Sequence, residues 1–116
     1  MSPRSEHGSS STWALALLGV LASLAVLLAG VGNALVAVRR AQAAADLAAL
    51  AGAAAQAAGQ AACPEAARVA RRNETRLSSC VALPEGDVRV VVSTTVRGPW
   101  PQPLQVRGRA RAGPAP

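Results

Sequence analysis

Two cysteines are the residues whose type and spacing can form a covalent link in this sequence. Cys63 and Cys80 are too few for a zinc site made of cysteines alone, and they are not spaced as a redox CxxC pair. In an oxidising compartment we expect them to form a disulfide, which adds about 3 kcal/mol of stability in the chain-entropy model. In the cytosol we expect two buried free thiols instead. The state of this pair therefore reports the compartment of the C-terminal half.

The remaining side chains form no catalytic pattern. The only histidine, His7, lies in the polar N-terminal segment, and the sequence has no His/Ser/Asp set, paired carboxylates, P-loop or metal-ligand cluster. We predict that the chain is not an enzyme and that it uses no cofactor, metal or small-molecule substrate.

Basic side chains are the second chemical feature. All twelve are arginines, and with six acidic residues they give a formal charge of +6. A basic face could bind anionic lipid, an acidic wall polymer or nucleic acid, although simple solvation is the more ordinary role. Nucleic acid is not expected, because the chain has no Phe or Tyr for base stacking. The candidate residues are Arg107, Arg109 and Arg111 near the C-terminus, with Arg68, Arg71, Arg72 and Arg76 on a predicted helix.

An uncharged apolar run follows a polar leader, residues 1–12. Residues 13–38 contain no charged side chain, and as a helix they would extend about 39 Å, beyond the roughly 30 Å hydrocarbon core of a bilayer. We predict a single transmembrane helix. The alternative is a cleaved signal peptide with its cleavage site at residues 32–37, although signal-peptide apolar regions are usually only about 7–15 residues long. Small residues four apart, Gly19 with Ser23 and Ala25 with Ala29, would let membrane helices approach closely.

The helix is predicted to continue into water over residues 39–62, which are rich in alanine and contain no proline. Gln42, Asp46, Gln56 and Gln60, with Ala49 and Ala53, fall on one stripe, whereas Leu47 and Leu50 lie elsewhere. Gly52 and Gly59 lower the helix propensity of its end.

Residues 63–112 are predicted to form a small α+β domain. Cys63-Pro64 favours a helix boundary, and a second helix is expected from Pro64 to about Leu77. Three strands follow in an antiparallel meander, at residues 81–83, 88–97 and 104–111, with Val88, Val90 and Val92 on a face that packs against the second helix. Residues 113–116 are predicted to be a disordered tail.

The charges that flank the apolar run and the two cysteines predict opposite membrane topologies. Arg39 and Arg40 outnumber Arg4, so the positive-inside rule places the C-terminal domain in the cytoplasm, whereas a disulfide requires export.

The segment RRAQAAADLAALAGAAA directly after the apolar run, followed by the Cys-Pro break and Val-rich strands, resembles the TadE-like and TadG-like proteins of tight-adherence pilus systems. The similarity is greatest to small actinobacterial TadE-like proteins found beside helicase and secretion genes. The motif residues in this chain are Arg39, Arg40, Gln42, Asp46, Leu47 and Gly52.

The resemblance implies a pilin-like precursor with a cytoplasmic N-terminus, an extracytoplasmic C-terminal domain and leader cleavage between Gly8 and Ser9. It implies a structural or accessory component of a Tad/Flp pilus or of a type II/IV-related secretion machine. Such a component would act by helix packing in the membrane, with pilin-like subunits or secretion-platform proteins as partners. Trp13 stands at the fifth position after that cleavage site, where pilins carry Glu, so a minor component that stays in the membrane is also consistent. Two other readings remain open, a membrane-anchored Arg-rich module that binds anionic lipid or wall polymer and a small secreted protein.

Overall fold

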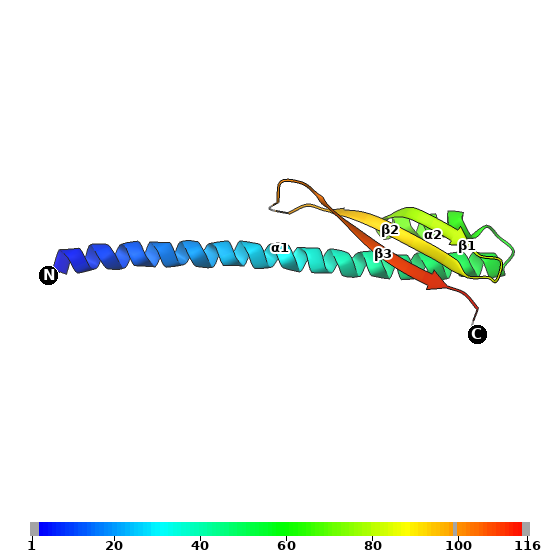
Figure 1. The fold of residues 1–116 in the computed structure, drawn as a ribbon, viewed down its shortest axis with the longest axis horizontal. Helices are drawn as coiled ribbons and strands as arrows, with labels where there is room; N and C mark the ends of the chain where they lie inside the picture. Colours follow the sequence, from blue (N-terminus) through cyan, green and yellow to red (C-terminus); the bar gives the residue numbers. More distant parts are fainter. Residues whose placement is uncertain (1–2, 99, 115–116) are drawn as a thin grey trace. The chain divides into compact units, whose positions relative to one another are not determined.

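The structure, a computed structural model, describes residues 3–98 and 100–114, with side chains from Ser9 onward. Two helices, α1 (Pro3–Ala57) and α2 (Ala62–Arg72), precede three strands, β1 (Arg76–Ala82), β2 (Val88–Val96) and β3 (Leu104–Ala112) (Figure 1). The predicted α+β class, with a long N-terminal helix, a short second helix and a three-stranded antiparallel sheet, is confirmed. Contacts divide the chain into two units, Met1–Gly32 and Asn33–Pro116.

The first unit exposes apolar side chains on every side of α1. Leu15, Leu18 and Val20 point in different directions around the helix, and each is more than half exposed. In the described part of the chain, α1 is the one helix long and apolar enough to cross a membrane, and only 6% of its most apolar window is buried. The hydroxyl of Ser23 donates to the carbonyl oxygen of Gly19 at 2.8 Å, so this polar group is satisfied within the helix.

Helix α1 ends at Ala57, earlier than the predicted Ala62, because Gly59 supplies a left-handed residue with φ of +79°. The N–H of Gln60 donates to the carbonyl of Ala55 at 2.8 Å, and the N–H of Gly59 donates to that of Gln56 at 3.0 Å. These two bonds form a Schellman motif, which closes the helix and turns the chain toward α2.

Helix α2 begins at Ala62 and ends at Arg72 rather than near Leu77. Glu74 adopts a left-handed φ of 58°, and the N–H of Thr75 donates to the carbonyl of Ala70 at 3.0 Å. The hydroxyl of buried Thr75 donates to the same carbonyl at 2.8 Å. This second Schellman-type end stops the helix before Arg76, which therefore belongs to β1 and not to α2.

The three strands form an antiparallel sheet in the order β1-β2-β3, as the predicted meander requires. Strand β1 starts at Arg76, before the predicted Val81, and a register shift between Leu77 and Ser79 interrupts its alternation. Because of this bulge and its polar residues, the start of β1 lacks the alternation of apolar and polar residues that predicts a strand. Gly113 and Pro114, predicted to belong to a disordered tail, lie against Asp87 and Gly86 in the β1–β2 turn, and residues 115–116 lie outside the described residues.

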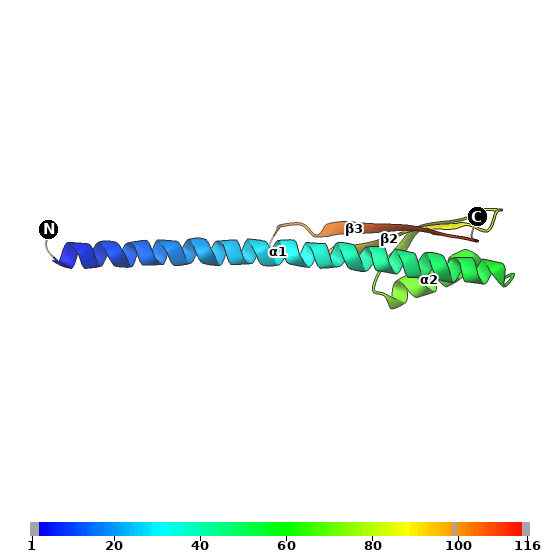
Figure 2. The same cartoon turned by 90° about the horizontal axis from the view of Figure 1, so that it is seen from below.

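Both helices of the second unit lie on one side of the sheet, which Figure 2 shows edge-on. The sheet was predicted to pack on the second helix, and α1 covers it as well. Gly52 of α1 approaches Val88 of β2, and Gly108 of β3 lies on the backbone of Ala41. Ala49, predicted to share a stripe with polar residues, is buried. The core consists of small side chains: Ala41, Ala44, Ala45, Ala48 and Ala49 of α1, Ala62, Ala66 and Ala70 of α2, and Val88, Val90 and Val92 of β2.

Candidate interaction surfaces

The described residues contain no group of three or more His, Cys, Asp or Glu that could hold a metal ion.

Gln42 joins α1 to the free edge of β3. Its Nε2 donates to the carbonyl of Arg109 at 2.7 Å, and its Oε1 accepts from the N–H of Arg109 at 3.3 Å. The carboxylate of Asp46 accepts from the same Nε2 at 3.2 Å, which orients the amide. The Gln42 amide thus satisfies both backbone groups of one residue on an edge strand that has no further strand beside it.

We call the contact of Gln42 with the backbone of Arg109 the clamp. Near it, two glycines let the backbones of the sheet and α2 approach α1 closely. A Cβ on Gly108 would collide with the carbonyl group of Ala41, so only glycine allows β3 to cross α1 there. A Cβ on Gly52 would lie 3.1 Å from Val88 and 3.3 Å from the carbonyl oxygen of Ala62. Gly52, a motif residue that was also predicted to weaken the helix, therefore lies where α1, α2 and β2 meet.

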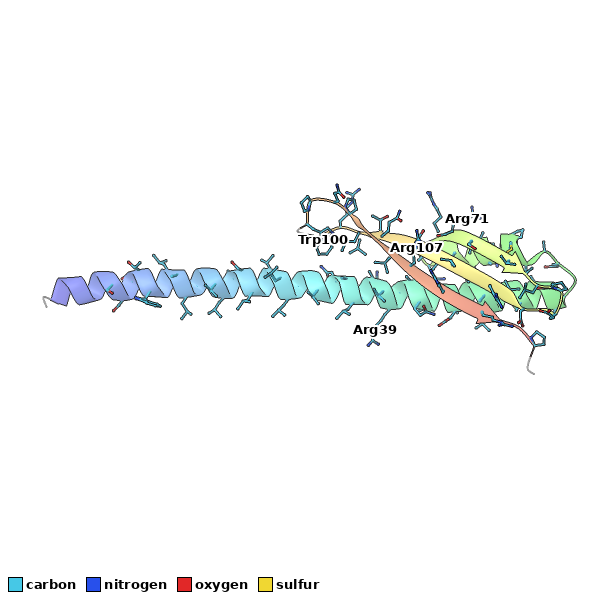
Figure 3. The ribbon with its side chains drawn as sticks, viewed as in Figure 1. Arg39, Arg71, Trp100 and Arg107 are labelled. Carbon is cyan, nitrogen blue, oxygen red and sulfur yellow. A yellow bond between two sulfur atoms is a disulfide. The ribbon has the colours of Figure 1, made fainter. Side chains whose placement is uncertain are left out.

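The six motif residues divide into two groups. Gln42, Asp46 and Gly52 make contacts that hold the fold of the second unit, whereas Arg39, Arg40 and Leu47 are exposed. The side chain of Arg39 points away from the sheet (Figure 3).

Cys63 and Cys80 form a disulfide with a Cα–Cα distance of 5.8 Å. Cys63 lies in the first turn of α2, and Cys80 lies on β1, which runs back along that helix. Near this end of the unit, Nε2 of Gln56 also donates to the carbonyl of Leu83 at 3.1 Å, so α1 is tied to the β1–β2 turn.

A stripe of apolar residues on α1 remains uncovered in the second unit. Leu47 and Leu50 are 48% and 59% exposed, although alanines on the opposite side of the helix are fully buried. Spacing of four, three and four residues places the stripe on one helical face. We call this surface the leucine stripe; it comprises Ala43, Leu47, Leu50 and Ala54.

The outer face of the sheet, which neither helix covers, carries arginines from all three strands. The register places Arg89 directly opposite Arg111, and places Ser93 between Arg76 and Arg107. Among the arginines of this outer face, only Arg111 has an acidic partner in the described part of the chain. That partner is Asp87, at the end of the β1–β2 turn. We call this surface the arginine face; it comprises Arg76, Arg89, Arg107, Arg109 and Arg111.

The sequence identified only part of this face. Arg107, Arg109 and Arg111 were predicted together, and Figure 3 labels Arg107 on β3. Arg89 joins them through strand register, which an isolated sequence does not fix. Of the arginines of α2, Arg71 lines a hollow together with Arg76 and Gln105 of the outer face. Arg68 pairs with Glu65 one turn earlier, and this hydrogen bond lowers the pKa of the Glu65 carboxyl.

The predicted cleavage site lies within α1. Gly8 and Ser9 fall inside the helix bounds, the side chains before Ser9 lie outside the described residues, and Ser9 itself is exposed. Processing at this site stays a prediction.

No family model matches this sequence, and no curated protein or solved structure shows significant similarity to it. The likeness to TadE-like proteins therefore rests on the motif residues and their context.

Proposed function

We propose that this chain is a pilin-like structural or accessory component of a tight-adherence pilus or a type II/IV-related secretion machine. Residues 13–38 hold it in the membrane, the N-terminus faces the cytoplasm, and the disulfide-closed unit lies outside. Its partners are pilin-like subunits or secretion-platform proteins, which pack against α1.

The observation that carries this proposal is that α1 serves two purposes. Its N-terminal part exposes apolar side chains all round, and its C-terminal part forms the core of a small α+β unit with an alanine face. A helix of this kind suits a membrane-held subunit. Exposure of apolar side chains such as Leu15 and Leu18 to water costs free energy, and the hydrocarbon of a bilayer would cover them. The disulfide supports export, since such bonds persist in oxidising compartments.

The leucine stripe supports helix packing as the mode of action. Large apolar side chains point outward from α1, whereas the sheet and α2 pack on its alanines. A neighbouring subunit's helix would bury Leu47 and Leu50 by the same ridge-and-groove packing that joins helices in bundles.

The first experiment probes Cys63 and Cys80 in intact cells with a membrane-impermeant maleimide, with and without mild external reduction. Labelling only after external reduction is the expected result, because the disulfide is then outside the membrane. Labelling that needs lysis and no reductant would place the unit in the cytoplasm and contradict the proposal.

Mass spectrometry of the mature N-terminus separates processing routes in the same cells. A chain that starts at Ser9 supports prepilin-type cleavage, and an intact N-terminus supports a permanent anchor. Cleavage at residues 32–37 would identify a small secreted protein and remove the membrane-held role.

The arginine face favours a second candidate, a membrane-anchored module that binds an acidic wall polymer or anionic lipid. Like charges directly opposite on neighbouring strands destabilise a sheet, so the pairing of Arg89 with Arg111 has an energetic cost in the free chain. An anionic partner would offset that repulsion, and its binding would weaken steeply as salt is raised.

A further inference from the structure

The β2–β3 loop, described at residues 97–98 and 100–103, lies at the end of the second unit where the apolar run of α1 finishes. Strand β2 starts with Val88, which lies beside Gly52 of α1. It ends with Val96, which lines a hollow together with Asn33 and Val36 of α1. Because β2 therefore runs along α1 toward its apolar part, the loop after β2 emerges next to residues 33–38. All these residues belong to the second unit, so this placement is independent of the first.

The loop has the composition of a membrane-interface segment. Trp100, one of only two tryptophans in the chain, is partly exposed, and Leu104 just after the loop is 46% exposed. Tryptophan concentrates at the level of lipid headgroups, because its ring is apolar and its N–H is polar. The other tryptophan, Trp13, begins the apolar run.

The indole N–H of Trp100 has no hydrogen-bond partner among the described residues, and its ring packs on Gly98. An indole N–H that is covered without a partner is unfavourable, and partly exposed tryptophans normally satisfy theirs. A rotation of the ring away from Gly98 would uncover this N–H, and ester carbonyl and phosphate oxygens of lipids are acceptors that it would then meet in the headgroup layer. Figure 3 shows Trp100 in the loop beside α1.

The charges around the loop also match a lipid surface. Arg40 of α1 and Arg97 at the start of the loop line one hollow together with Glu74; all three are exposed, so two of its three charges are basic. No acidic residue follows Asp87 in the sequence, so nothing acidic in the loop or in β3 opposes contact with phosphates. Arginine binds phosphate oxygens well, since its planar guanidinium presents several donors.

We propose that residues 97–103 rest in the headgroup layer of the membrane that holds α1, with Trp100 as the interfacial anchor and Arg97 against lipid phosphates. This inference rests on the proposed membrane span but not on the pilus role. The soluble unit would then touch the bilayer at two places, the end of the span and the loop, and could not rotate freely about the helix.

The two tryptophans allow a direct test with the full chain reconstituted in phosphatidylcholine vesicles that contain phosphatidylglycerol. The variant Trp13→Phe leaves Trp100 as the only fluorophore, and Trp100→Phe leaves Trp13. We expect lipids brominated near the headgroup end of their chains to quench Trp100 more strongly than deeply brominated lipids do, because tryptophan at the interface lies at headgroup level. Iodide in the water would quench it little.

The outcomes separate this inference from the proposed span. Lipid quenching of Trp13 with none of Trp100 would leave the span intact and overturn the loop anchor. Absence of lipid quenching at both tryptophans would contradict the span itself, and the loop anchor with it.

A matched charge reversal tests the role of Arg97 in the Trp13→Phe background. Arg97→Glu should reduce the lipid quenching of Trp100 in anionic vesicles, because the carboxylate is repelled by phosphates. Arg89→Glu makes the same change at the other end of β2 and should leave quenching unchanged. Equal effects of the two variants, or no effect of Arg97→Glu, would contradict a local contact between Arg97 and lipid.

Discussion

Glu74 illustrates how a single residue sets the boundary between helix and strand. It is the only residue other than glycine with a left-handed φ in the described part of the chain. Side chains with a Cβ tolerate this conformation poorly, and glycine adopts it without steric cost. The position is needed because the second Schellman-type bond, from Glu74 N–H to the carbonyl of Arg71, forms only with this turn.

Replacement of Glu74 by glycine should therefore stabilise the protein by about 1 kcal/mol. Glu74→Ala removes the same charge but keeps the Cβ, so it should give no comparable gain. Chemical unfolding of the full chain in mild detergent, followed by circular dichroism, measures both. An equal gain for the two variants would show that charge, and not backbone conformation, is responsible.

Gln42 is the residue whose loss should loosen β3 from α1. Gln42→Ala removes both hydrogen bonds to Arg109 and leaves an edge strand without that support, so we expect a loss of about 1–3 kcal/mol. Gln105→Ala is the control, because Gln105 is exposed on the outer face of β3 and should change stability by less than about 0.5 kcal/mol. Similar losses in the same unfolding experiment would argue against the clamp.

At the scale of elements, the disulfide links α2 to β1 in a unit whose largest fully buried side chains are valines. Such a core contributes little apolar area per residue, and small domains of this kind depend on covalent staples.

Loss of the disulfide should cost about 3 kcal/mol in the chain-entropy model. Cys63→Ser, Cys80→Ser and the double variant should have nearly the same melting temperature, because each removes the same bond. A double variant as stable as the oxidised parent would show that the staple is dispensable.

The leucine stripe predicts where a neighbouring subunit touches α1. A photo-crosslinking amino acid at Leu50 should give a crosslinked product with pilin-like or platform proteins in cells that assemble the machine. The same amino acid at Arg72, which is exposed on α2, is the matched control and should give much less product. Equal crosslinking at both sites would indicate random collision.

For the whole molecule, charge is distributed unevenly around the second unit. The helices cover the inner face of the sheet, and the arginine face is left open on the other side. Because the strands run along α1, this face is turned sideways from the end that carries the β2–β3 loop. A polymer or protein beside the subunit could reach it independently of the loop.

If the arginine face binds a wall polymer, Arg107→Gln with Arg109→Gln should reduce retention on an acidic polysaccharide column at low salt. The double change Arg68→Gln with Arg72→Gln removes the same charge from α2 and is the control. A loss of retention shared by both pairs would indicate net charge alone, which salt screens equally for either surface.

The sequence by itself determined the types of element, because their signals are local. An uncharged run of residues 13–38 predicts a spanning helix, and alternation in residues 88–97 predicts a strand with its valines inward. Cys63-Pro64 predicts a second helix from Pro64, and that helix begins two residues earlier, at Ala62. The sequence did not predict the early start of β1, because the bulge beside Ser79 breaks the period-two pattern. It did not predict the full arginine face, because register is a property of paired strands.

Only the tertiary structure decided which face of α1 is buried after Arg40. Alanine is common on every side of this segment, so hydrophobic periodicity gives no clear direction, and hydrophobicity alone would bury Leu47 and Leu50. The structure buries alanines instead, because Gly108 and Gly52 bring the backbones of the sheet and α2 against α1. Leucine in that interface would hold those backbones too far apart, and its exclusion leaves the large apolar side chains on the surface.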